Sequence, residues 1–195
     1  MITERGTILL PIARAAISQV LNVPQAADET APWLVEHGAC FVTLTQDGEL
    51  RGCIGSLQAH RPLLADVKNN AVSAALRDPR FTPLTVAELD ITTVEVSLLS
   101  TTQEMVVRDE ADALAQMRPG VDGIIFEYGR YRSTFLPQVW ESLAQPRDFL
   151  GMLRRKAGLP DDFWAEGVKL SSYTVTKWSE SENLLAGQAK ERQHG

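Results

Sequence analysis

Hydrophobic and polar positions alternate along the chain in two different periods. Residues 7–22 carry apolar side chains at helical spacing, and Pro11 fits best in a first turn, so we expect the helix to start near Leu9. Pro62 opens a second helical pattern that ends near Asp78-Pro79. The same reasoning predicts shorter helices over 109–117, 138–144 and 147–157, the last of them capped by Gly158.

The remaining apolar segments follow the two-residue period of strands. Residues 39–45 and 49–57 flank Asp47-Gly48, a strong hairpin pattern. Residues 90–100 alternate as a half-buried strand, with Val94, Val96 and Leu98 pointing inward. A second hairpin is expected over 120–137, turning near Gly129, and a last strand over 168–178. Two hairpins, each followed by helices, predict an α+β fold of antiparallel sheets with packed helices.

The length of 195 residues allows one large domain or two packed lobes. No Gly/Ser-rich linker separates the halves, so we treat residues 1–195 as one domain. If there are two lobes, the loop at 101–109 is the expected junction. The polar segment 187–195 is expected to be a disordered tail.

Composition excludes several classes of partner. The formal net charge of −6 argues against broad binding to nucleic acid or to anionic membranes, which need concentrated positive charge. No apolar run approaches the roughly 18–20 residues of a membrane span. Two cysteines make no disulfide framework, so a cytoplasmic location is expected. No nucleotide-binding or cofactor-binding motif occurs, and no cofactor is predicted.

The segment GELRGCIGSL, residues 48–57, places Cys53 between two glycines. With a clean two-residue turn at Asp47-Gly48, Leu44 faces Arg51, Val42 faces Cys53, and Cys40 lies diagonally from Cys53 on one face of the hairpin.

Three interpretations of this segment stay open. Arg51 could favour the thiolate of Cys53, with Gly55 leaving space above the sulfur for a ligand. Alternatively, Cys53 packs as a small apolar residue while Gly52 and Gly55 allow a close backbone approach. The third is ligand binding without covalent chemistry.

A metal site is a weaker candidate. His37, Cys40, Cys53 and His60 fall toward the open end of the hairpin, but their spacing does not match zinc patterns. We therefore predict no metal. Glu95 is a candidate partner for Arg51 or Arg80, although a solvated glutamate is the favoured interpretation.

Six segments in order carry a family resemblance. They are LRGCIGS (50–56), DPRFTPL (78–84), ITTVEVSLLS (91–100), GVDGIIFE (120–127), FLPQVW (135–140) and FLGMLRRKAGLP (149–160). Together, across roughly residues 8–180, they resemble the AMMECR family, whose microbial members are called AmmeMemoRadiSam system protein A. The hexapeptide from Leu50 to Gly55 is the most specific of them.

The resemblance implies two unequal lobes with a cleft between them and a biochemical activity that is not established. It also implies a link to a Memo-like protein and a radical-SAM enzyme in a three-component system. The ligand would be a small molecule or a peptide. The candidate binding residues are Arg51, Gly52, Gly55, Ser56, Arg80 and Glu95, with Phe81 in the second motif.

No acid–base pair with diagnostic spacing accompanies this motif. A binding or accessory component is therefore the favoured function. The alternative is an enzyme in which Cys53 acts as a thiolate nucleophile activated by Arg51.

Overall fold

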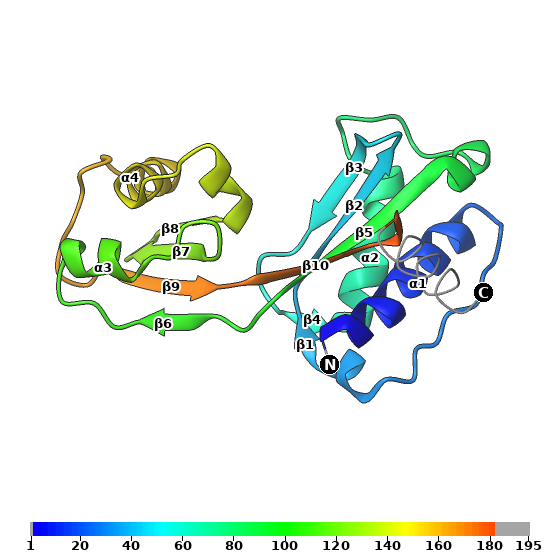
Figure 1. Cartoon of the computed structure of the whole chain (residues 1–195), viewed down its shortest axis with the longest axis horizontal. Helices are drawn as coiled ribbons and strands as arrows, with labels where there is room; N and C mark the ends of the chain where they lie inside the picture. Colours follow the sequence, from blue (N-terminus) through cyan, green and yellow to red (C-terminus); the bar gives the residue numbers. More distant parts are fainter. Residues whose placement is uncertain (1, 182–195) are drawn as a thin grey trace, which may run out of the picture. The chain divides into compact units, whose positions relative to one another are not determined.

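Residues 2–181 are described by a computed structural model, in which the chain forms two compact units (Figure 1). The first unit combines the residues up to Leu99 with those from Thr176 onward. The second, the inserted unit, is Ser100–Val175. The chain therefore leaves the first unit once and returns to it once.

The first unit is built on a four-stranded sheet in the order β10-β5-β2-β3. Strand β2 pairs antiparallel with both β3 and β5. The strands of this unit are β1 (His37–Gly38), β2 (Cys40–Gln46), β3 (Glu49–Gly55), β4 (Arg61–Pro62), β5 (Thr92–Leu99) and β10 (Val175–Ser179), whose first residue is counted with the inserted unit. Its helices are α1 (Ile2–Val20), η1 (Pro32–Val35), α2 (Leu63–Leu76) and η2 (Val86–Ile91).

One face of this sheet packs against α1 and α2 and forms the core of the first unit. Val42 and Leu44 of β2 and Val94 and Val96 of β5 are fully buried there, which confirms the inward face predicted for residues 90–100. The opposite face and the free edge of β3 carry the residues of the LRGCIG motif whose side chains are not in the core.

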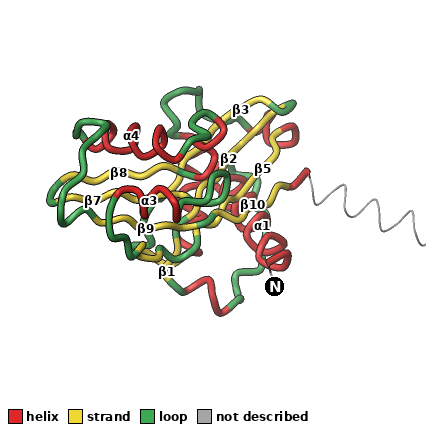
Figure 2. The backbone as a smooth tube through the Cα atoms, turned by 60° about the vertical axis from the view of Figure 1, so that its left-hand side comes forward, coloured by secondary structure: helices red, strands yellow, loops and turns green. Residues whose placement is uncertain are grey.

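The inserted unit has its own four-stranded sheet, in the order β6-β9-β7-β8. Helix α4 runs beside β8 (Figure 2) and contacts β7 and β8. Helix α3 contacts α4. Its core includes Phe126 and a stacked pair, Trp140 and Phe149, whose ring centroids are 3.8 Å apart. The elements are β6 (Gln103–Met105), α3 (Glu110–Gln116), β7 (Gly123–Tyr128), β8 (Tyr131–Phe135), η3 (Pro137–Glu141), α4 (Pro146–Ala157) and β9 (Lys169–Tyr173).

The α+β class is confirmed, and so are both hairpins and the Gly158 cap, which has a φ of 91°. The helix expected over 138–144 is the shorter 3-10 helix η3 (Pro137–Glu141). Two other element predictions were wrong. Helix α1 begins at Ile2 and holds Pro11 in its interior, where the ring is exposed and the flanking apolar residues are buried. The single strand expected over 168–178 is two strands, because β9 pairs within the inserted unit and β10 within the first.

The register of the β2–β3 hairpin also differs from the expectation. Gln46 faces Glu49 as predicted, but a bulge follows, so Leu44 faces Gly52 and Arg51 is the extra residue. Cys53 therefore lies opposite Thr43 rather than Val42. Because side chains alternate, Cys53 and Cys40 are on opposite faces of the sheet, and the predicted diagonal contact between the two thiols was wrong.

No helix among residues 2–181 combines the length and the apolar character needed to cross a membrane. The tail predicted at 187–195 lies outside the described residues.

Candidate functional site

The DPRF segment closes over the free edge of β3 at Cys53. One oxygen of Asp78 accepts the Cys53 backbone N–H at 2.9 Å, and Arg80 donates from Nη2 to the Cys53 carbonyl oxygen at 3.2 Å. An edge strand leaves such groups without a neighbouring strand, so this pairing satisfies them. Two motifs 25 residues apart in sequence thus meet at one peptide unit.

Asp78 and Arg80 also hold each other. Arg80 donates to Asp78 from Nε at 2.9 Å and from Nη2 at 2.6 Å, while the Asp78 side chain is only 2% exposed. The Arg80 guanidinium keeps the pKa of Asp78 well below its ordinary value, and the Cys53 N–H lowers it further against the opposing effect of burial. Asp78 is therefore a carboxylate at neutral pH, and its charge fixes the direction of Arg80.

Arg51 takes a different acidic partner from the one expected. Its Nε and Nη2 lie 3.0 Å from the same oxygen of Glu88, on η2. Glu95 instead pairs with Lys177 at 3.1 Å, so it is neither the candidate partner of Arg51 or Arg80 nor the unpaired, solvated glutamate that was favoured. The register explains this outcome, because Glu95 belongs to β5 and is separated from β3 by β2.

Glu88 is itself held in place by the turn that precedes η2. The backbone N–H and the hydroxyl of Thr85 both donate to it, which, with the help of Arg51, lowers the pKa of Glu88 to about 2. Glu88 in turn binds Arg51 through its Nε and Nη2 groups. The Arg51 Nη1 has no hydrogen-bond partner among the described residues.

The Cys53 thiol is half-buried and accepts a hydrogen bond from the Thr43 hydroxyl, with 3.3 Å between oxygen and sulfur. Within residues 2–181, no histidine or carboxylate side chain is hydrogen-bonded to this sulfur. Phe81 lies near both cations, its ring centroid 6.0 Å from Cζ of Arg51 and 5.4 Å from Cζ of Arg80. We call Arg51, Cys53, Arg80 and Phe81 the motif surface.

The two glycines of the motif serve packing. A Cβ at Gly52 would lie 2.2 Å from the carbonyl oxygen of Ala74, so α2 approaches β3 more closely than any side chain permits. A Cβ at Gly55 would lie 2.2 Å from the ring of Phe41. The space expected above Gly55 for a ligand is therefore filled by Phe41, and that expectation was wrong.

Ser56 belongs to a buried cluster on the core side of the hairpin. Its hydroxyl donates to Asp66 at 2.6 Å, and Asp66 also accepts from Asn70, from the Cys40 N–H and from Arg61. Ser56 is thus placed to hold a buried carboxylate rather than to meet a ligand from solvent. Burial strongly raises the pKa of the Cys40 thiol here, and the charge of Asp66 adds to the effect.

Asp66 and Asn70 were missed by reasoning from the sequence. They lie four residues apart on the apolar stripe of the helix that Pro62 opens, where polar residues interrupt the pattern. Polar groups at core positions of a helix need buried partners, and that pattern could have identified them.

The candidate zinc ligands are not brought together. No group of three or more His, Cys, Asp or Glu residues suited to a metal ion occurs within residues 2–181.

A family model for AMMECR1 matches residues 10–178 of the chain. The chain belongs to the AMMECR1 family. It is 39% identical over 188 residues to protein MJ0810 of Methanocaldococcus jannaschii, covering 92% of each chain. A protein of Thermofilum pendens is 36% identical over 182 residues, covering 84% of each.

A solved structure supports the fold of this AMMECR1 chain. The crystal structure of the uncharacterized protein PH0010 from Pyrococcus horikoshii matches with a TM-score of 0.74 and 33% sequence identity. The match covers 91% of this chain and 92% of that one. The predicted family is therefore confirmed, and the relatives bring no defined activity with them.

Proposed function

We propose that this protein is a binding or accessory component of a modification system that includes a Memo-like protein and a radical-SAM enzyme, and that the motif surface holds its ligand or partner. The observation that carries the proposal is the placement of two arginines within 6.0 Å of the Phe81 ring centroid, next to Cys53. Both cations are oriented by carboxylates of the same unit, Glu88 and Asp78.

Oriented arginines suit recognition more than they suit fold stability. The Arg80 side chain is 53% exposed although its partner Asp78 is buried, so part of its guanidinium faces solvent. The Arg51 side chain is 11% exposed, and its buried Nη1 has no hydrogen-bond partner among the described residues. A carboxylate, a phosphate or a planar amide can bind to such guanidinium groups and stack on the neighbouring ring. We therefore expect an anionic or amide-bearing group of the ligand at this surface.

The alternative, an enzyme with Cys53 as nucleophile, is favoured by one observation. The Thr43 hydroxyl donates to the sulfur, and a donated hydrogen bond stabilises a thiolate. Against it stands the lack of a hydrogen-bonded base at the sulfur within the described residues. Binding without covalent chemistry needs neither the base nor the thiolate, and so it fits the geometry better.

The test uses a Memo-like protein and a radical-SAM enzyme, each purified and immobilised separately. We expect the wild-type chain to bind at least one of them, and Arg51→Ala to weaken this binding about tenfold or more. Arg108→Ala is the matched control, because Arg108 is also ion-paired to a carboxylate but lies in the inserted unit and is 84% exposed. It should bind like the wild type.

Two results would overturn the proposal: no binding to either protein, or equal binding by the wild type and Arg51→Ala. Thermal unfolding of each variant shows whether a lost interaction reflects a lost fold. Cys53→Ser separates the two functions, since a binding surface keeps most of its affinity without the thiol. Rapid alkylation of native Cys53 by iodoacetamide at neutral pH, together with loss of function in Cys53→Ser, would favour the enzyme.

A further inference from the structure

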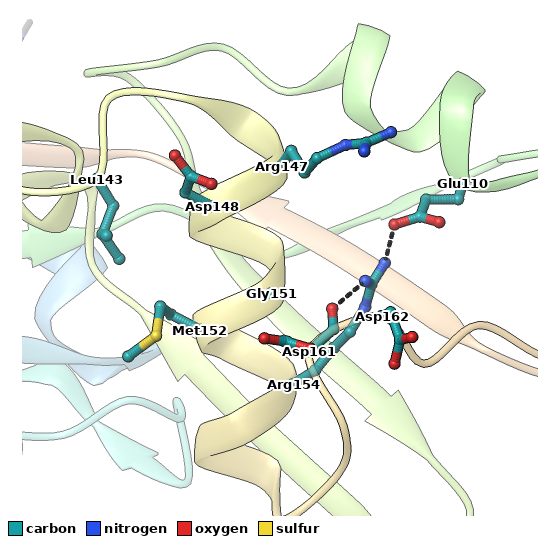
Figure 3. Close-up of a pocket in the computed structure, with 9 residues that line it drawn as sticks. All are labelled: Glu110, Leu143, Arg147, Asp148, Gly151, Met152, Arg154, Asp161 and Asp162. Atoms are coloured by element: carbon teal, nitrogen blue, oxygen red, sulfur yellow. Dashed lines mark hydrogen bonds and ion pairs between the residues drawn. The ribbon is translucent and has the colours of Figure 1, made fainter.

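A trough of about 530 Å³ lies along α4 in the inserted unit, away from the residues of the motif surface in the sequence (Figure 3). Helix α4 provides most of its wall, and Glu110 of α3, Leu143 and the loop at Asp161 and Asp162 provide the rest. Helix α4 comes from FLGMLRRKAGLP, a motif to which the proposed function gives no role.

Gly151 lies in the middle of α4 and lines this trough. An interior helical glycine is less favourable than alanine, so its presence requires a reason. Packing does not supply one, because a Cβ at this position would meet Asp161 only at ordinary contact distances of 3.4 and 3.5 Å. Without a side chain at Gly151, the floor of the trough stays open.

Arg154 is buried beside the trough and is not fully satisfied. Its side chain is 2% exposed, and in Figure 3 it extends from α4 toward α3. Its Nη1 donates to the carbonyl oxygen of Asp161 at 2.6 Å and its Nη2 to Glu110 at 2.5 Å, while Nε has no partner among the described residues. The Arg154 Nε–H is thus a buried donor at this end of the trough that the described residues leave without an acceptor.

Three further charges of the lining are not engaged. The Arg147, Asp148 and Asp162 side chains make no ion pair or hydrogen bond with the rest of residues 2–181. Glu110 is paired with Arg154, and Asp161 with Arg155. The lining therefore offers two free carboxylates, one free guanidinium and the apolar side chains of Leu143 and Met152.

We infer that the trough along α4 binds a basic amino acid, a small molecule with one carboxylate and two cationic groups on an aliphatic stem. The ligand's two positive charges and one negative charge are opposite in sign to the two carboxylates and the guanidinium that are unpaired in the lining. Asp148 and Asp162 receive the two cations, and Arg147 and the open donor of Arg154 receive the carboxylate. The methylene stem lies over Gly151 and contacts Leu143 and Met152.

The test titrates L-lysine into protein labelled with ¹³C at the methionine methyl groups. The chain has four methionines, and Met152 lines the trough, so its methyl resonance reports on occupancy. We expect a saturable shift of this resonance and no shift at Met105, which lies on β6. Norleucine lacks the side-chain cation and cadaverine lacks the carboxylate, and each should bind at least about tenfold more weakly.

Variants identify the groups responsible. Asp148→Asn/Asp162→Asn should lose about tenfold or more in lysine affinity, and Gly151→Leu should block the trough. Glu104→Gln, an exposed residue of β6, is the control and should bind lysine like the wild type.

No Met152 shift with lysine up to about 20 mM would overturn the inference. Equal binding of cadaverine and lysine would do the same, because it removes the role of the carboxylate. So would unchanged affinity in Asp148→Asn/Asp162→Asn. Failure here leaves the motif surface untouched, since none of these residues belongs to it.

Discussion

Replacing Gly52 by alanine adds one methyl group at the closest contact between β3 and α2. The new Cβ would lie 2.2 Å from the carbonyl oxygen of Ala74 and 3.1 Å from its carbonyl carbon, whereas real Cβ atoms essentially never approach other atoms within 3.0 Å. The oxygen belongs to the backbone of α2 and has no rotamer that could relieve the contact. The helix or the strand has to move as a unit.

The magnitude follows from that rigidity. Overpacking of a core typically costs about 1–3 kcal/mol, and a clash with backbone belongs at the upper end, so we expect Gly52→Ala to lower the free energy of unfolding by about 3 kcal/mol. Gly55→Ala is the matched control. Its Cβ would also lie 2.2 Å from a neighbour, but that neighbour is Cγ of the half-buried Phe41, a side chain that can leave by a change of its χ1 rotamer, which backbone cannot. We expect about 1–2 kcal/mol.

The assay is urea unfolding of the three proteins, with the midpoint and the slope fitted for each. Gly52→Ala should shift the midpoint more than Gly55→Ala and lower the melting temperature by about 6–12 °C. Equal shifts for the two variants would refute the reasoning, because they would show that α2 yields as easily as an aromatic side chain. A wild-type midpoint for Gly52→Ala would refute the close approach itself.

Three further predictions concern charge and burial. Because the fold lowers the pKa of Glu88 from 4.5 to about 2, the stability that this carboxylate contributes is complete above pH 4.5 and is lost as the pH falls toward 2. The urea midpoint of Glu88→Gln should therefore fall less steeply over this pH range than that of the wild type. Parallel pH dependences of the two midpoints would contradict this prediction. Asp66→Ala leaves several buried donors without an acceptor and should cost about 3–5 kcal/mol by urea unfolding, a loss under about 1 kcal/mol being the contrary result. Iodoacetamide should modify Cys53 in the native protein but Cys40 only after unfolding, because Cys40 is buried and burial raises the pKa of its thiol. Peptide mass spectrometry identifies the labelled cysteine, and labelling of Cys40 in the native protein would disprove the prediction.

Local patterns in the sequence were enough for the elements but not for their pairing. Asp47-Gly48 marks the turn of the first hairpin because both residues adopt positive φ there, 51° and 84°. The bulge at Arg51 has no comparable local mark, since it depends on which side chains of β3 fit beneath α2. Because of this one extra residue, Cys53 lies opposite Thr43 and not opposite Val42, so the neighbours expected for Cys53 were displaced by one position.

The hydrogen-bond partners of the motif residues could not be predicted from the sequence for a different reason. Asp78 is bonded to Cys53 across 25 residues, and Glu88 to Arg51 across 37. Such contacts depend on the path of the chain between α2 and β5, which no hydrophobic period encodes. Pro11 was misplaced because the rule that excludes proline from helix interiors was applied without the burial of its neighbours Leu10 and Ile12, whose packing outweighs it.

The insertion of Ser100–Val175 between β5 and β10 sets the order in which the protein can fold during synthesis. Strands β5 and β10 are hydrogen-bonded neighbours, yet β10 leaves the ribosome only after the whole inserted unit. One edge of β5 therefore has no hydrogen-bonded neighbouring strand while residues 100–175 emerge and fold. An inserted unit that folds early, with Ser100 and Thr174 joined by a 2.9 Å backbone hydrogen bond, brings the last strand to that edge as soon as it appears.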